Sequence, residues 1–161
     1  MEYKTNSTEE TIRLGEGLAR FLRSGDVVLL DGDLGAGKTH FVKGLARGLG
    51  ITADVSSPTF TILNNYPVDA DTEKHGAAQL NHFDVYRVHD EEEILDLGFE
   101  EIIYSNDISI IEWSGLISGI LPEDHLKITI TLGEDEDERI INMTWSNAQT
   151  ERSLPHADPG L

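Results

Sequence analysis

The chain lacks cysteine, has few basic residues and contains no long apolar run. Without cysteine it can form no disulfide, no thiolate zinc site and no cysteine nucleophile, and this absence is compatible with a reducing cytosol. No segment is apolar over the length that a membrane span requires, and the first residues, Met1 to Asn6, lack the basic and apolar regions of a signal peptide. These absences predict a soluble, cytoplasmic protein with no membrane segment.

Basic residues are scarce, since Lys and Arg total 12 whereas Asp and Glu total 30, and the formal net charge is −18. Because such a surface repels the phosphate backbone of nucleic acids, we do not expect an electrostatically driven RNA or DNA binder. Contact with nucleic acid is expected through a partner or at a local basic spot. The acidity itself fits either a high-salt cytoplasm or an ordinary acidic domain.

The chain of 161 residues has the length of one packed domain, and its hydrophobic content of 39% indicates a globular fold. We expect a single domain over residues 1–145 and a disordered, polar tail over residues 146–161. Apolar periodicity and turn residues predict helices at 7–22, 38–49, 90–98 and 99–104, strands at 26–31, 60–63, 83–88, 108–112, 126–132 and 139–145, and an exposed loop at 67–79.

A glycine-rich segment joins the strand expected at 26–31 to the helix that follows. It reads Gly32-Asp33-Leu34-Gly35-Ala36-Gly37-Lys38-Thr39 and satisfies the P-loop pattern of Gly, four residues, Gly, Lys and Thr. Glycines let consecutive N–H groups turn towards a phosphate, and the helix dipole points at the same anion. Lys38 would neutralise the β- and γ-phosphates, and the Thr39 hydroxyl would be a magnesium ligand. A plain glycine-rich turn is the alternative, but the flanking strand and helix favour nucleotide binding.

The motif and the order of elements predict the fold class. We expect an α/β protein with a three-layer fold of the P-loop NTPase type, a mixed, mostly parallel central sheet and a C-terminal antiparallel hairpin.

Two acids are candidates for the magnesium site and for catalysis. Glu112 ends the apolar strand expected at 108–112, where P-loop enzymes place their second magnesium ligand. Asp84 follows a less apolar stretch, and for this residue alone a solvated carboxylate is an equal alternative. Either acid could bind magnesium directly or through water, or could orient an attacking water.

Other polar and aromatic residues give weaker signals. The hydroxyl-rich segment Ser56 to Thr61 could order around a γ-phosphate as switch loops do, although its spacing alone favours a plain Ser/Pro turn. We expect His82 to be a structural histidine with its hydrogen bonds satisfied, and Trp113 to serve in packing rather than in an interaction. The sequence has no His-rich cluster that would bind a transition metal.

Four ordered blocks together resemble one family. They are Gly32 to Thr39, Ser57-Pro58-Thr59-Phe60-Thr61, His82-Phe83-Asp84-Val85-Tyr86-Arg87 and Ile111-Glu112-Trp113. The chain resembles the bacterial tRNA threonylcarbamoyladenosine biosynthesis protein TsaE family, also called the YjeE ATPase family, over about Thr8 to Trp145.

This resemblance implies a small P-loop ATPase that uses ATP and Mg²⁺, hydrolyses ATP slowly by itself and works with TsaB and TsaD. Those partners transfer a threonylcarbamoyl group to the adenosine next to the anticodon. The chain would support their turnover without carrying out the transfer, and would reach tRNA only through them.

The resemblance also implies roles for individual residues. Lys38, Asp84 and Glu112 would be catalytic, and Thr39, Glu112 and Asp84 would bind magnesium. His40 stands where relatives often have a second Thr, and the connection before His82 is longer than expected. The nucleotide would contact Gly32, Asp33, Leu34, Gly35, Ala36, Gly37, Lys38, Thr39, His40, the switch-like Thr59 and Thr61, and, near the adenine, Thr8, Thr11 and Arg139.

Two other functions stay open. A stand-alone P-loop kinase for a small molecule is one, although Arg87 is the single arginine between Arg47 and Arg139 and such kinases usually carry an arginine-bearing lid. A non-catalytic module whose conformation is set by the nucleotide is the other. A guanine-specific GTPase is disfavoured, because no Asn-Lys-X-Asp sequence occurs.

Overall fold

The computed structural model describes residues 1–58, 61–69, 76–147 and 152–156. The strands are β1 (Glu2–Thr5), β2 (Val27–Asp31), β3 (Leu63–Pro67), β4 (Gln79–Asp84), β5 (Ile108–Glu112), β6 (Leu126–Leu132) and β7 (Arg139–Trp145). The helices are α1 (Thr8–Ala19), α2 (Lys38–Gly48), α3 (Glu91–Leu95), α4 (Phe99–Ile103) and the 3₁₀ segment η2 (Ser114–Ile120).

All these strands form one sheet in the order β1-β7-β6-β2-β5-β4-β3. The central strands β6, β2, β5 and β4 are parallel to one another. The pairs β1 with β7, β6 with β7 and β3 with β4 are antiparallel. The mixed sheet and the C-terminal hairpin predicted from the sequence are therefore confirmed.

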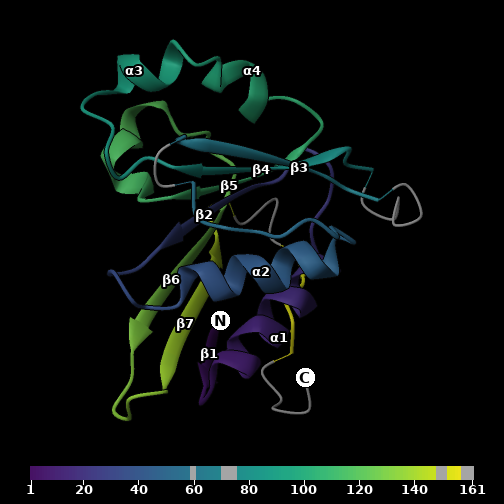
Figure 1. The fold of residues 1–161 in the computed structure, drawn as a ribbon, viewed down its shortest axis with the longest axis vertical. Helices are drawn as coiled ribbons and strands as arrows, with labels where there is room; N and C mark the ends of the chain where they lie inside the picture. The colour runs from purple at the N-terminus through teal and green to yellow at the C-terminus, as the bar shows by residue number, and fades with distance from the viewer. Residues whose placement is uncertain (59–60, 70–75, 148–151, 157–161) are drawn as a thin grey trace.

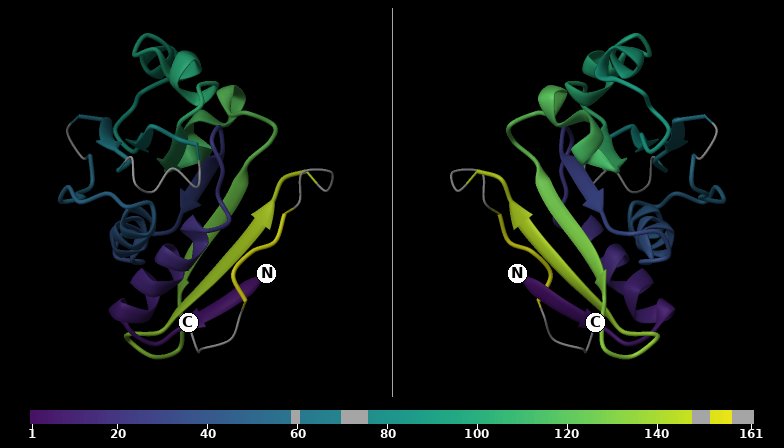
Figure 2. Two further views of the ribbon diagram at one scale, coloured as in Figure 1. Left: turned by 90° about the vertical axis from the view of Figure 1, so that its right-hand side faces the viewer. Right: turned by 90° about the vertical axis from the view of Figure 1, so that its left-hand side faces the viewer.

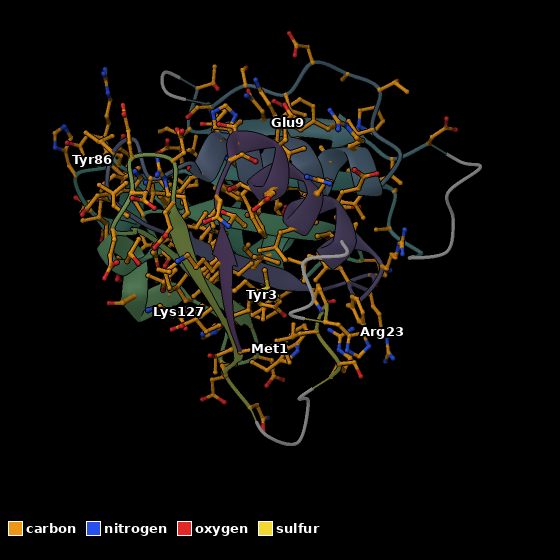
Figure 3. The ribbon with its side chains drawn as sticks, turned by 90° about the horizontal axis from the view of Figure 1, so that it is seen from below. Met1, Tyr3, Glu9, Arg23, Tyr86 and Lys127 are labelled. Carbon is orange, nitrogen blue, oxygen red and sulfur yellow. The ribbon has the colours of Figure 1, made fainter. Side chains whose placement is uncertain are left out.

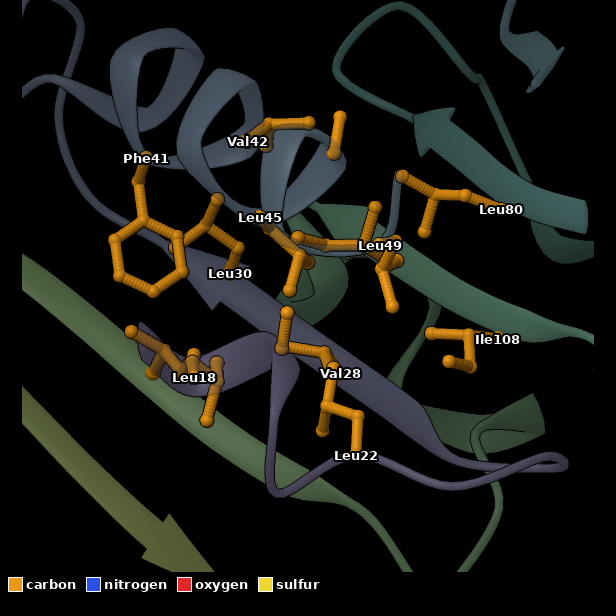
Figure 4. Close-up of a cluster of buried hydrophobic side chains, with 14 of the residues drawn as sticks. Leu18, Leu22, Val28, Leu30, Phe41, Val42, Leu45, Leu49, Leu80 and Ile108 are labelled. Atoms are coloured by element: carbon orange, nitrogen blue, oxygen red, sulfur yellow. The ribbon is translucent and has the colours of Figure 1, made fainter. Parts of the chain in front are cut away.

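Strand β2 has a packed layer on each side because successive side chains point to opposite faces of a strand. Val28 and Leu30 pack in the layer of α1 and α2, and Val27 and Leu29 pack in the layer of α3, α4 and η2. Figure 1 shows the two helical layers on either side of the sheet, and Figure 4 shows Val28 and Leu30 among the side chains of the first layer. This confirms the predicted three-layer α/β architecture.

The helices α1 and α2 pack closely at glycine positions. A β-carbon at Gly44 would collide with the carbonyl oxygen of Ile12, and one at Gly15 would collide with that of Phe41. The two backbones can approach this closely because neither position carries a side chain. The contact fixes the helix α2, whose first two residues, Lys38 and Thr39, are the last two of the P-loop motif.

Some elements differ from the expectation. Strand β1 was not predicted, because a four-residue edge strand with only Tyr3 and Thr5 buried gives little periodicity. Strand β4 spans Gln79–Asp84 rather than 83–88, because the buried polar residues Asn81 and His82 interrupt the apolar pattern from which a strand is predicted. Strand β3 is Leu63–Pro67 rather than 60–63, because its two asparagines are poor strand formers and hide it in the sequence pattern. Residue 60 of the predicted strand lies outside the described residues.

The segment 152–156 lies along β1 and β7 (Figure 2). The carbonyl oxygen of Pro155 accepts a 2.7 Å hydrogen bond from the Tyr3 hydroxyl, and the Arg152 guanidinium lies 4.4 Å from the centroid of the Trp145 ring. Arg152 also pairs with Asp26. The division into a domain and a disordered tail stays a prediction.

Within these described ranges, no helix combines the length and the apolar character needed to cross a bilayer.

Candidate functional site

The P-loop runs from the end of β2 to the start of α2. Gly35 and Gly37 have φ values of 80° and 103°, in the left-handed region where a glycine carries no steric cost. Gly37 is the N-cap of α2, so the free N–H groups of the first helical turn begin at the loop. This is the local geometry that binds an anion at a helix N-terminus.

Lys38 is the basic group of the loop and is only 7% exposed. Its ammonium donates to the carbonyl oxygen of Gly32 and lies 3.9 Å from the centroid of the Trp113 ring. Burial lowers the pKa of the Lys38 ammonium, while Glu112 and Asp84 act in the opposite direction. The loop therefore holds a desolvated cation beside its own backbone.

A cleft of about 230 Å³ opens at this point. Leu34, 73% exposed, lies at its rim. Asp84 and Glu112 come from paired positions at the ends of the parallel strands β4 and β5, which places both carboxylates at one edge of the sheet. The lining residues are Leu34, Gly35, Gly37, Lys38, Thr39, His40, Ser57, Asp84, Glu112 and Trp113.

The two carboxylates have different surroundings. Asp84 accepts hydrogen bonds from the Ser57 hydroxyl, at 3.2 Å, and from the backbone N–H of Tyr86, at 3.0 Å. Glu112 is 3% exposed, and its Oε2 lies 2.6 Å from Nε2 of the buried His82.

His82 is not the fully satisfied structural histidine expected from the sequence. Its ring is buried, and Nδ1 has no hydrogen-bond partner among the atoms of the described residues. Leaving a buried polar atom unpaired costs about 1–3 kcal/mol.

The donor set fits magnesium better than a transition metal. Within the described part of the chain no three His, Cys, Asp or Glu side chains gather as a metal site. Thr39, Asp84 and Glu112 supply oxygen atoms around the cleft. Magnesium is usually held by one or two carboxylates, water and substrate phosphates rather than by an all-protein cage.

A second cleft of about 90 Å³ adjoins the P-loop. It shares the residues Gly35, Gly37 and His40 with the first cleft, so the two clefts are adjacent. Thr8, Thr11, Asp137 and Arg139 complete its lining. The sequence-predicted adenine contacts Thr8, Thr11 and Arg139 are thus brought together.

Arg139 connects the C-terminal hairpin to the P-loop. Its Nε donates to the carbonyl oxygen of Ala36 at 3.0 Å, and its Nη2 donates to that of Gly35 at 3.5 Å. The remaining loop residues differ in exposure, since Ala36 is buried and Asp33 is exposed.

The hydroxyl-rich segment is only partly in the cleft. Thr59 lies outside the described residues. Thr61 is exposed, donates to Asn64 at 3.1 Å and does not line the cleft in the described structure. Among the described residues of this segment, Ser57 is the one that lines the cleft, where its hydroxyl donates to Asp84.

Sequence reasoning named Ser57 only as part of the hydroxyl-rich segment and expected a packing role for Trp113, so neither was assigned to the site. The rings of Trp113 and Tyr86 lie 4.7 Å apart between centroids. Figure 3 shows Tyr86 at one margin of the molecule, away from Tyr3 and Met1. Of these two aromatic residues Trp113 lines the cleft, and its position next to Glu112 in the sequence was the available signal.

Comparisons with known proteins agree with one another. A family model described as "Threonylcarbamoyl adenosine biosynthesis protein TsaE" matches residues 5–141. A tRNA threonylcarbamoyladenosine biosynthesis protein TsaE of Bacillus subtilis is 44% identical over 144 residues, or 89% of this chain and 85% of that protein. The TsaE protein of Treponema pallidum is 40% identical over 140 residues, or 87% and 98% of the two chains. The crystal structure of Bacillus subtilis YdiB matches with a TM-score of 0.77 and 38% identity, covering 92% of this chain and 87% of that one.

Proposed function

The chain belongs to the TsaE family, and from this membership we propose that it binds and hydrolyses ATP for the machinery that makes threonylcarbamoyladenosine in tRNA. One observation carries the proposal. The P-loop lysine, a threonine hydroxyl and two carboxylates line a single cleft at the carboxyl edge of the parallel strands. This combination suits a magnesium-bound nucleoside triphosphate.

The loop would bind the phosphates of ATP. The N–H groups at the start of α2 and the left-handed Gly35 and Gly37 would face the phosphate oxygens. Lys38 would exchange its contact with the Gly32 carbonyl for the β- and γ-phosphates, which are stronger partners for an ammonium.

Thr39 and Glu112 would hold the magnesium ion, with Asp84 close enough to help directly or through water. Bound magnesium supplies Lewis-acid stabilisation of the charge that develops on the phosphate oxygens. Asp84 is fixed by Ser57 and by the Tyr86 N–H, so it would orient the water that attacks the γ-phosphorus as ADP leaves.

The second cleft would receive the adenosine. It shares Gly35, Gly37 and His40 with the phosphate cleft, and its other polar residues come from α1, from the turn before β7 and from β7 itself. Thr8, Thr11 and Arg139 would contact the adenine, and His40 would stand between the base and the phosphates.

The proposed partners are proteins of the TsaB and TsaD type in the cytoplasm, and tRNA would be reached only through them. The net charge of −18 supports an indirect contact with tRNA, since a polyanion is repelled by an acidic surface. The ATPase activity would be weak for the isolated chain and would rise with the partners.

A reconstituted tRNA modification assay tests this function. Purified TsaB- and TsaD-type proteins would be supplied with tRNA and the threonylcarbamoyl donor, with no added chain, with the wild type or with Lys38→Ala. We expect multiple turnover only in the reaction that contains the wild-type chain. Equal turnover in all three reactions would contradict the proposal, and transfer of labelled phosphate from ATP to a small acceptor without partners would instead support a kinase.

A further inference from the structure

We propose that His82 is a positioning residue for Glu112. The Nε2–H of His82 holds Oε2 of the carboxylate and leaves Oε1 for the ligand in the cleft. This inference deepens the proposed function and rests on it.

The contact is short and buried. Nε2 and Oε2 are 2.6 Å apart, the His82 side chain is 0% exposed and that of Glu112 is 3% exposed. A hydrogen bond to a carboxylate in such a place is not weakened by competing water. The two atoms share one proton, and the proposed arrangement places it on Nε2, so that Oε2 accepts the hydrogen bond.

The sheet register places the two residues for this contact. In the parallel pair of β4 and β5, Asp84 is opposite Glu112 and His82 is opposite Ile110. Side chains two residues apart share one face of a strand, so His82 lies on the same face as Asp84 and one step behind the cleft. Glu112 is thus in contact with a buried ring behind it and with the cleft in front.

Packing alone does not account for a histidine here. Within the described residues the ring makes its single side-chain hydrogen bond to Glu112, and Nδ1 stays unpaired. The neighbouring buried residue Asn81, by contrast, bonds to Asn65, Asp107 and Ser109. An apolar ring would fill the space of His82 without an unpaired nitrogen, so the bond to Glu112 is the feature that requires the imidazole.

Fixing one oxygen of Glu112 has a chemical consequence. A carboxylate that keeps one orientation presents Oε1 at one place in the cleft, and no side-chain rotation has to be frozen when a cation binds. Loss of a partner that orients a metal ligand typically lowers metal affinity or activity 10- to 100-fold.

Two substitutions separate orientation from packing. His82→Phe keeps a flat, buried ring but removes the donor, whereas His82→Gln places an amide N–H near the position of Nε2. Phe83→Leu is the matched control, because Phe83 is equally buried in β4 but packs in the opposite layer, against Phe99. For each protein, binding of a fluorescent ATP analogue would be titrated with Mg²⁺ and repeated with EDTA, and kcat and KM would be measured.

We expect His82→Phe to raise the Mg²⁺ concentration for half-maximal binding about 10- to 100-fold and to lower kcat in the same range. Affinity for the metal-free analogue should not change, His82→Gln should recover most of the loss, and Phe83→Leu should keep the wild-type Mg²⁺ requirement. A folded His82→Phe with wild-type behaviour would overturn the inference, as would His82→Gln being equally impaired or Phe83→Leu shifting the Mg²⁺ requirement to the same extent.

The inference can also be tested on the wild-type protein, so the test does not depend on whether a variant folds. Long-range ¹H–¹⁵N NMR of the histidine rings should show a proton on Nε2 of His82, and an unprotonated Nε2 would overturn the inference. Nucleotide binding by the wild type that is independent of Mg²⁺ would instead overturn the proposed function and leave the NMR result standing.

Discussion

The ammonium of Lys38 lies 3.9 Å from the centroid of the Trp113 ring, so the P-loop and the residue after Glu112 are in direct contact. Trp113 has a φ of 61°, which is unusual for a bulky residue. The next residue, Ser114, donates from its backbone N–H and its hydroxyl to Asp31. The end of β5 is thereby tied to the end of β2, and the indole face is turned towards the lysine.

Replacing Lys38 by methionine should separate binding from folding. Methionine keeps an unbranched side chain against Trp113 but removes the charge that would pair with phosphate. We expect the dissociation constant for ATP to rise at least tenfold, or about 1.4 kcal/mol. The unfolding temperature should stay the same or increase, because burial lowers the pKa of Lys38 and thus disfavours its charged form. Calorimetric titration and thermal unfolding give the two values, and unchanged ATP affinity would remove Lys38 from the site.

Arg139 should influence nucleotide affinity through the shape of the loop. Its guanidinium bonds to the carbonyl oxygens of Gly35 and Ala36, and a lysine cannot reproduce this fork. We expect Arg139→Ala and Arg139→Lys both to weaken ATP binding about tenfold. Arg20→Ala, an exposed change in the turn after α1, serves as the control and should keep wild-type affinity. Wild-type affinity in Arg139→Lys would show that charge alone matters at this position.

The glycine contact between α1 and α2 should limit stability. Gly44→Ala introduces a methyl group against the carbonyl oxygen of Ile12, and such overpacking costs about 1–3 kcal/mol. Gly115→Ala, where a β-carbon would meet nothing within 4 Å, should change the free energy of unfolding by less than about 0.5 kcal/mol. Urea unfolding of both variants tests the difference, and equal stabilities would mean that the helices can separate without cost.

Tyr3 should make stability depend on alkaline pH. Burial raises the pKa of Tyr3 from 10.0 to about 12, so the folded state keeps its phenol proton where the unfolded chain loses it. The stability that the protonated phenol contributes to the folded state is complete below pH 10 and is lost as the pH rises towards 12. Tyr3→Phe also loses the hydrogen bond to Pro155, about 1 kcal/mol at pH 8, and its deficit against the wild type should shrink above pH 10. A deficit that stays constant from pH 8 to pH 11 would contradict the raised pKa.

The sequence predicted the P-loop strand and helix, β5 and the C-terminal hairpin well, because their apolar residues follow a regular period. It misplaced β4 because polar side chains there are satisfied by residues distant in sequence. The buried Asn81 bonds to Asp107 and Ser109, and this partnership exists only once the sheet has formed.

The residues of the site were predicted from the sequence, but the contacts between them were not. The P-loop motif predicted Lys38 and Thr39, the end of an apolar strand predicted Glu112, and the family resemblance added Asp84. The structure places all four in the lining of one cleft. The contacts that orient them were not predictable, since the bond between His82 and Glu112 depends on the register of β4 against β5. No local pattern encodes that register.

The central position of β2 has a consequence for the dynamics of the P-loop. The strand is hydrogen-bonded to β5 on one side and β6 on the other, and it is covered by a packed layer on each face. Amide protons in such a strand exchange through the largest unfolding events of a protein. The P-loop therefore begins at the segment expected to open last, and little conformational entropy would be lost when a phosphate is bound there.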